Sequence, residues 1–153
     1  MRGGKISLFD DLYDRFHEIH TDLVKAVDGL PAKALDWTPG AETNSINVLV
    51  VHLAGAERYW LGLALGEPPE RVREQEFRAR GLTADELKQH LSAADDYARQ
   101  ALARFSFADM DTVRKSPRND KTFTTGWCIL HALEHSALHL GHVQLTRQVW
   151  EQG

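Results

Sequence analysis

Four histidines recur within one short stretch near the C-terminal end of this chain: His131, His135, His139 and His142. Their spacings of four, four and three residues place all four side chains within an arc of about 80° on an α-helix. A neutral imidazole is a good ligand for a transition metal, and two imidazoles one turn apart can bind the same ion. Histidine is a poor core residue, because both ring nitrogens need partners. We therefore predict a metal site on this helix, with a solvated or core-packed histidine face as the alternative.

A site inside a helical protein needs a ligand from a second helix, and His52 is the candidate. It lies on the flank of an apolar helical stripe, where a side chain can reach inward yet stay close to solvent. A single histidine in such a place is usually structural, and it gains interest only because of the histidine row. We predict that His135 and His139 bind the ion from one helix and His52 from the other. His131 and His142 are candidates for supporting or substitute roles.

The remaining residues narrow the kind of metal chemistry. Cys128 is the only cysteine, which disfavours a closed structural zinc site built from thiolates. Three imidazoles would instead leave an open position, the arrangement suited to Lewis-acid or activated-water chemistry. The Glu-x-x-His pairs of di-iron bundles and the His-Glu-x-x-His pattern of metalloproteases are both absent. His17 and His20 have no partner at ligand spacing, and we interpret them as non-ligands.

Composition sets the class of protein. The 153 residues are 42% hydrophobic and 26% charged with a net charge of −4, which is typical of one soluble globular domain spanning residues 1–153. No basic stripe indicates nucleic-acid binding, and the apolar runs fall short of the roughly 20 residues that a membrane span requires. The first residues lack an apolar signal core, and Cys128 fits a small core residue in a reducing compartment. We therefore expect a cytoplasmic protein with no nucleic-acid or membrane partner.

Hydrophobic periodicity predicts an all-α four-helix bundle. Apolar residues recur at three- and four-residue steps over four stretches: residues 8–27, from 43–45 to 65, 83–105 and 125–150. The last stretch is apolar around most of its circumference, so we expect it to be the most enclosed helix. We predict loops over residues 30–42 and 106–123, and a charged, partly helical connection over 70–81 that could cover one mouth of the bundle. Bundles commonly build metal sites from facing helices.

Two segments resemble the DinB/YfiT-like family of metal-dependent four-helix-bundle proteins. One is the run of histidines at intervals of four followed by Gly141, late in the last long helix, and the other is SINVLVVHLAGAERYW at residues 45–60. The order and spacing of the helices resemble the family over nearly the whole chain. One departure stands out, since relatives often carry Arg-Gly-Gln after the last ligand where this chain has Leu140-Gly141-His142.

The resemblance implies an up-down-down-up bundle with one divalent metal, zinc or nickel, held by His52, His135 and His139. It also implies a homodimer. Characterised relatives include transferases and isomerases that use a low-molecular-weight thiol, whereas many members have no known activity. A thiol cosubstrate and a small-molecule substrate are therefore expectations that come from the resemblance alone.

Two functions compete at this stage. The first is a metal-dependent enzyme acting on a small molecule, either a thiol-dependent S-transferase or a hydrolase, since a bound ion activates a thiol or a water. The second is a non-catalytic metal-binding bundle of a stress response that acts through dimerisation or a protein partner. The sequence assigns no catalytic residue, and His131 and His142 are the candidates for a general base.

Overall fold

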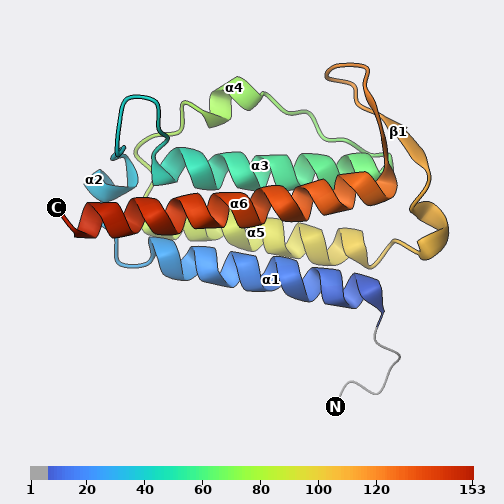
Figure 1. Ribbon diagram of the computed structural model, residues 1–153, viewed down its shortest axis with the longest axis horizontal. Helices are drawn as coiled ribbons and strands as arrows, with labels where there is room; N and C mark the ends of the chain where they lie inside the picture. The colour runs from blue at the N-terminus through green and yellow to red at the C-terminus, as the bar shows by residue number, and fades with distance from the viewer. Residues whose placement is uncertain (1–6) are drawn as a thin grey trace, which may run out of the picture.

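The computed structural model describes residues 7–153 and contains four long helices around one core (Figure 1). The long helices are α1 (Leu8–Val27), α3 (Ile46–Leu65), α5 (Ala84–Leu102) and α6 (Thr125–Glu151). Figure 1 shows α1 and α6 running in one direction and α3 and α5 in the other. Each of α3 and α1 packs against both α5 and α6. The fold is therefore the predicted four-helix bundle with up-down-down-up topology.

Helix starts follow the capping residues in the sequence. The residues before the four long helices share a hydroxyl that accepts a hydrogen bond from a backbone N–H of the first turn: Ser7, Ser45, Thr83 and Thr124. The capping box between Thr83 and Glu86 is present as predicted. Helix α5 ends at Leu102, three residues before the end predicted for this stretch, and the chain then turns through residues 103–105.

The connections contain more regular structure than predicted. Residues 30–42 include a single helical turn, α2 (Ala32–Leu35), which begins directly after Pro31 because proline is compatible with a helix start. Residues 106–123 include the short helix η1 (Phe107–Asp109) and most of a two-stranded antiparallel hairpin, β1 (Val113–Lys115) with β2 (Thr122–Thr124). The predicted partly helical connection contains α4 (Arg73–Glu76). The interpretation of the first two segments as plain loops was therefore wrong.

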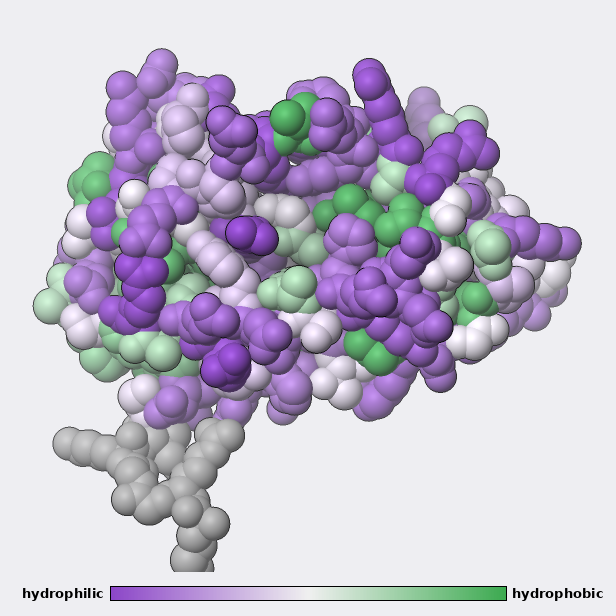
Figure 2. Space-filling model, turned by 180° about the vertical axis from the view of Figure 1, so that it is seen from behind, coloured by the Kyte–Doolittle hydropathy of each residue, from purple (hydrophilic) through white to green (hydrophobic). Residues whose placement is uncertain are grey.

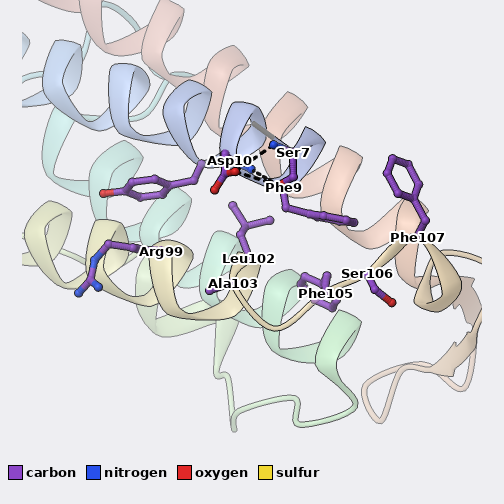
Figure 3. A pocket seen from close by; sticks show the side chains of 10 residues that line it. Ser7, Phe9, Asp10, Arg99, Leu102, Ala103, Phe105, Ser106 and Phe107 are labelled. Atoms are coloured by element: carbon purple, nitrogen blue, oxygen red, sulfur yellow. Dashed lines mark hydrogen bonds between the residues drawn. The ribbon is translucent and has the colours of Figure 1, made fainter. Parts of the chain in front are cut away.

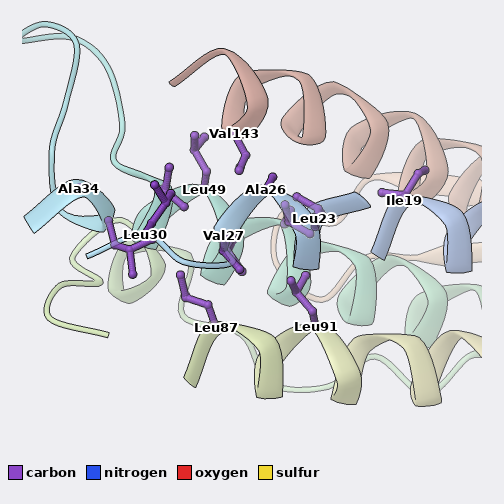
Figure 4. Packing of buried hydrophobic residues seen from close by; sticks show 14 residues of the cluster. Ile19, Leu23, Ala26, Val27, Leu30, Ala34, Leu49, Leu87, Leu91 and Val143 are labelled. Atoms are coloured by element: carbon purple, nitrogen blue, oxygen red, sulfur yellow. The ribbon is translucent and has the colours of Figure 1, made fainter. Parts of the chain in front are cut away.

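The core runs the length of the bundle. One half, shown in Figure 4, brings together leucine, isoleucine and valine side chains from all four long helices, among them Leu23, Leu49, Leu91 and Val143. The other half is centred on Phe16, Tyr59 and Ile129. Trp37 packs edge-on against Trp150, with ring centroids 5.6 Å apart, and anchors the loop before α3.

The most enclosed helix is α3, not α6, which corrects the expectation from the sequence. By length and composition α3 could cross a membrane. However, 67% of its most apolar stretch is buried inside the bundle, as expected for a core helix. In contrast, α6 carries exposed leucines at Leu130, Leu138 and Leu145. Figure 2 shows the face on the far side of the molecule from the view in Figure 1. Hydrophilic residues predominate on this face, and hydrophobic ones lie in small groups.

Candidate metal centre

Three histidines from two antiparallel helices converge between α3 and α6. His52 Nε2 lies 3.1 Å from His135 Nε2, which in turn lies 3.1 Å from His139 Nε2. One ligand atom from each residue falls within 4.8 Å of the others, in what we call the histidine triad (His52, His135 and His139). His52 is buried, whereas His135 and His139 are half-buried, so one side of the triad faces solvent. The structure thus brings together the three residues that the sequence singled out, and their binding of a metal stays a prediction.

Burial and mutual proximity keep two of these imidazoles neutral. Desolvation, with the neighbouring His139 and His52, lowers the pKa of His135 from 6.5 to about 3. Desolvation and His52 lower the pKa of His139 to about 4. Because a metal ligand must be the neutral imidazole, neither side chain needs to lose a proton at neutral pH before binding a cation.

The carboxylate of Glu76 fixes the orientation of the His52 ring through Nδ1, the nitrogen outside the triad. Its Nδ1 lies 3.0 Å from Glu76 Oε1, and Arg71 holds both oxygens of Glu76 through Nε and Nη2 at 2.8 and 2.7 Å. Burial opposes ionisation of Glu76, but its bonds to Arg71 and His52 outweigh that effect and lower its pKa. An ionised carboxylate at Nδ1 keeps the proton there and leaves the Nε2 lone pair free.

Gly55 makes room for that carboxylate. It lies three residues after His52 on α3, and a Cβ at this position would collide with Glu76 Oε2. A two-point bond to Arg71 prevents Glu76 from simply moving aside. Glycine at this position is therefore required by the bond between Glu76 and His52.

His139 and His135 differ in whether Nδ1, the ring nitrogen outside the triad, has a hydrogen-bond partner. His139 Nδ1 lies 3.2 Å from His142 Nδ1, so a proton on His139 Nδ1 would leave its Nε2 free toward the triad. His135 Nδ1 is buried and has no hydrogen-bond partner among residues 7–153.

The donor set fits a divalent transition metal. Two ligand atoms bound to one zinc ion at about 2.05 Å in tetrahedral geometry are roughly 3.3 Å apart, close to both of the 3.1 Å separations in the triad. A hydrogen bond between two neutral imidazoles uses one proton, so three converging Nε2 atoms cannot satisfy one another fully. A cation would satisfy all three lone pairs at once.

His131 belongs to an aromatic group at the N-terminal end of the histidine row. Its ring stacks on Trp127 with centroids 4.7 Å apart and meets Trp60 edge-on at 4.8 Å, while Trp127 stacks on Phe123 at 4.4 Å. Burial lowers the pKa of His131. We refer to Trp60, Phe123, Trp127 and His131 as the aromatic group. His131 is packed among these rings, and no hydrogen bond connects it to the triad.

A second buried polar cluster crosses the bundle without belonging to the triad. His20 lies 2.9 Å from Asp95 Oδ1 through Nδ1 and 3.0 Å from Glu57 Oε2 through Nε2. Ser136 donates a 2.7 Å hydrogen bond to Glu57, and Tyr13 donates one to Asp95. These side chains, which we call the polar network (Tyr13, His20, Glu57, Asp95 and Ser136), join α1, α3, α5 and α6. His17 lies at its edge, 3.0 Å from Asp95 Oδ1, and is exposed.

Other features lie apart from the triad. Figure 3 shows a pocket of about 490 Å³ between the start of α1 and the end of α5, lined in part by Phe9, Arg99 and Leu102 but by no triad residue. Arg147 binds backbone carbonyls of Lys25, Ala26 and Asp28 at the end of α1, so it serves the packing of two helices. Cys128 is buried in the core, and burial raises its pKa to about 11.

The fold and the triad together define a class of protein, a four-helix bundle with a candidate three-histidine metal centre. Residues 15–143 match the model of the DinB superfamily. The chain therefore belongs to the DinB superfamily.

Two solved structures share this architecture at low sequence identity. A conserved protein from Enterococcus faecalis superposes with a TM-score of 0.79 at 11% identity, over 94% of this chain and 97% of that one. YfiT from Bacillus subtilis, described as a probable metal-dependent hydrolase with an unusual four-helix bundle topology, superposes with a TM-score of 0.74 at 15% identity, over 99% and 93%. Both likenesses establish the fold. Comparison with curated protein sequences gave no match.

Proposed function

We propose that this protein is a divalent-metal-dependent enzyme that acts on a small molecule at the histidine triad. The observation that carries the proposal is the convergence of three Nε2 atoms on a partly exposed point, with the Nδ1 of His52 held by Glu76. His52, His135 and His139 would hold the ion, with zinc or nickel as the expected metal. A divalent ion held there would lower the pKa of a bound water or thiol.

Two reaction classes fit this centre. Hydrolysis would use an activated water, and it is supported by the description of YfiT as a probable metal-dependent hydrolase. Transfer to a low-molecular-weight thiol would use an activated thiolate, and it rests on the family resemblance in the sequence. His142 is the better candidate for handling a proton, because it is exposed and bonded to His139, whereas His131 is packed in the aromatic group.

The first experiment measures metal in protein purified without a histidine tag. We expect about one equivalent in the parent and in His90→Ala, whose side chain is exposed, and loss of the metal in His52→Ala, His135→Ala and His139→Ala. Each ligand removed should weaken binding by roughly two to three orders of magnitude, as structural zinc shares about 10–16 kcal/mol among four ligands. A parent that takes up neither zinc nor nickel would overturn the proposal.

The second experiment separates an enzyme from a non-catalytic metal-binding bundle. In cobalt-substituted protein, a small thiol or acetohydroxamate that reaches the ion should change the visible absorption of cobalt. A spectrum that neither probe changes would show a closed coordination shell and favour the non-catalytic alternative. Assays of thiol transfer and of ester and amide hydrolysis then decide between the two reaction classes.

We also propose that the protein works as a cytoplasmic homodimer, as expected from the resemblance and from the single cysteine. Leu130 and Leu138 are exposed on α6, and they are the apolar side chains that we expect at a contact between two copies. Sedimentation equilibrium should give twice the monomer mass, and a monomer at every concentration would contradict the dimer.

A further inference from the structure

A pocket of about 350 Å³ opens beside the triad, between the C-terminal part of α6 and the loop that leads into α3. Its walls come from α3, the preceding loop and α6: Leu49; Pro39, Glu42, Thr43 and Asn44; and His142, Leu145, Thr146 and Val149. We call it the α6 pocket. Its volume lies within the range of about 300–1,000 Å³ typical of small-molecule sites.

His142 joins this pocket to the triad. The imidazole lines the pocket, and its Nδ1 lies 3.2 Å from His139 Nδ1. The α6 pocket is therefore separated from His139 by one side chain, on the Nδ1 edge of the His139 ring. This continuity distinguishes the pocket from the one in Figure 3, which no triad neighbour lines.

The pocket presents a mainly apolar surface, and its two hydroxyl groups are already hydrogen-bonded. The exposed side chains of Glu42 and Asn44 supply the polar part of its lining. Thr146 Oγ1 donates a 2.7 Å hydrogen bond to the carbonyl of His142, and Thr43 Oγ1 donates one to the carbonyl of Gly40. Leu145 and Val149 line this space and are 58% and 39% exposed. None of the lining residues is a lysine or arginine, so the pocket offers no counter-charge to an anion.

The opposite end of the histidine row lacks these properties. In the aromatic group Phe123, Trp127 and His131 stack in sequence and bury part of one another, although Trp127 is still 42% exposed. The α6 pocket differs in enclosing a volume of about 350 Å³, so an apolar group there is surrounded on several sides. The α6 pocket is therefore the better place for an apolar part of a substrate.

We propose that the α6 pocket binds an uncharged, apolar portion of the small molecule whose reacting group lies at the triad. This inference rests on the proposed function, because it assumes that the triad holds a metal with an open position. It adds the substrate class, a molecule with a polar metal-binding head and an apolar tail, and it makes Leu145 and Val149 determinants of specificity.

The test uses zinc-loaded protein and linear alkyl hydroxamates, whose head group chelates zinc and whose tail can be lengthened one methylene at a time. Affinity measured by calorimetry should rise about fourfold per methylene from acetohydroxamate upward, the factor for burying one CH₂ group. In Leu145→Asp the acetohydroxamate affinity should be unchanged and the gain per methylene lost. Gln148→Asp is the matched control, since Gln148 is exposed on the same helix and does not line the pocket.

Each other outcome overturns a defined part of this inference. If acetohydroxamate binds but tail length has no effect, or the gain survives in Leu145→Asp, the inference fails and the proposed function stands. If Trp127→Ala removes the gain instead, the tail lies on the aromatic group. If Leu145→Asp turns a dimer into a monomer and tail length has no effect, a second copy fills the pocket. If acetohydroxamate does not bind the zinc-loaded parent, the proposed function and this inference fail together.

Discussion

The histidine triad and the polar network both lie between the long helices, and they are built in opposite ways. In the network, His20 lies between the carboxylates of Glu57 and Asp95, so the basic group has an acidic group on either side. In the triad, three like ring nitrogens meet with too few protons to pair. A cluster that alternates donors and acceptors can hold helices together by itself, whereas a cluster of like acceptors is suited to binding a cation.

The pKa shifts of the histidines show the same contrast between the two clusters. Burial alone would lower the pKa of His20, but hydrogen bonds and charge from Glu57 and then Asp95 outweigh it and raise that pKa above 6.5. Nothing acidic faces His135 in this way, so burial and its histidine neighbours lower its pKa to about 3. We therefore expect damage to the network to reduce folding stability and damage to the triad to reduce metal binding.

The largest expected effect is on stability. Glu57→Ala leaves His20 buried without one of its two carboxylates and leaves Ser136 without its acceptor. Breaking a buried ion pair from one side costs about 3–5 kcal/mol, so urea denaturation should show a loss of that size. Zinc affinity of the folded variant should stay within about threefold of the parent, because Glu57 bonds to His20 and Ser136 and not to a triad residue.

Glu134→Ala is the matched control for that prediction. Glu134 is an exposed acid on α6, and its removal should change stability by no more than about 0.5 kcal/mol. A Glu57→Ala variant as stable as Glu134→Ala would show that the network does not hold the helices. A large loss of zinc affinity in Glu57→Ala would show that the two clusters are coupled.

The triad should contribute to stability only through its metal. Zinc at about 100 times its dissociation constant should raise the free energy of unfolding of the parent by about 2.7 kcal/mol. His135→Ala should lose this gain while its stability in chelator stays close to the parent's, because the substitution removes a buried nitrogen without a partner. Equal stabilisation of parent and variant by zinc would place the ion elsewhere.

The sequence predicted the elements of this fold that depend on local signals. Hydroxyl caps at Ser45 and Thr83 and the regular apolar stripes predicted the long helices, and the spacing of His135 and His139 placed them on one face. A four-residue spacing on a helix fixes two side chains relative to each other before any tertiary contact is known.

What the sequence did not predict depends on contacts between distant segments. Glu76 lies on a single helical turn within a charged connection, where nothing distinguishes it from Glu74 until the fold buries it against His52. His20 was correctly placed near an apolar stripe, yet its partners lie 37 and 75 residues away on other helices. The sequence gives a signal for a buried acid only at Glu57, which is the single acidic residue of the largely apolar α3.

Gly55→Ala tests whether Glu76 tunes the triad. The new Cβ would displace Glu76 from His52, and loss of such a supporting carboxylate typically weakens metal binding 10- to 100-fold. Gly141→Ala on α6 is the matched control, because open space surrounds that position and alanine there favours the helix by about 1 kcal/mol. Competition with a zinc indicator measures both affinities. If Gly55→Ala binds zinc as tightly as Gly141→Ala, the carboxylate has no role in the centre.

The smallest expected effect is on the pH dependence of folding stability, which has opposite signs for the two clusters. His20 has a folded-state pKa above 6.5, so its contribution is complete below pH 6.5 and is lost as pH rises through that raised pKa. The folded-state pKa values of His135 and His139 are lowered, so these residues change stability only below pH 6.5. In that range the unfolded chain takes up protons that the folded chain does not. Between about pH 6.5 and 8.5 the parent should therefore lose more stability than His20→Gln does, in urea titrations with chelator present. Parallel pH profiles for the two proteins would mean that His20 is not held as an imidazolium between Glu57 and Asp95, and the contrast between the clusters would then rest on geometry alone.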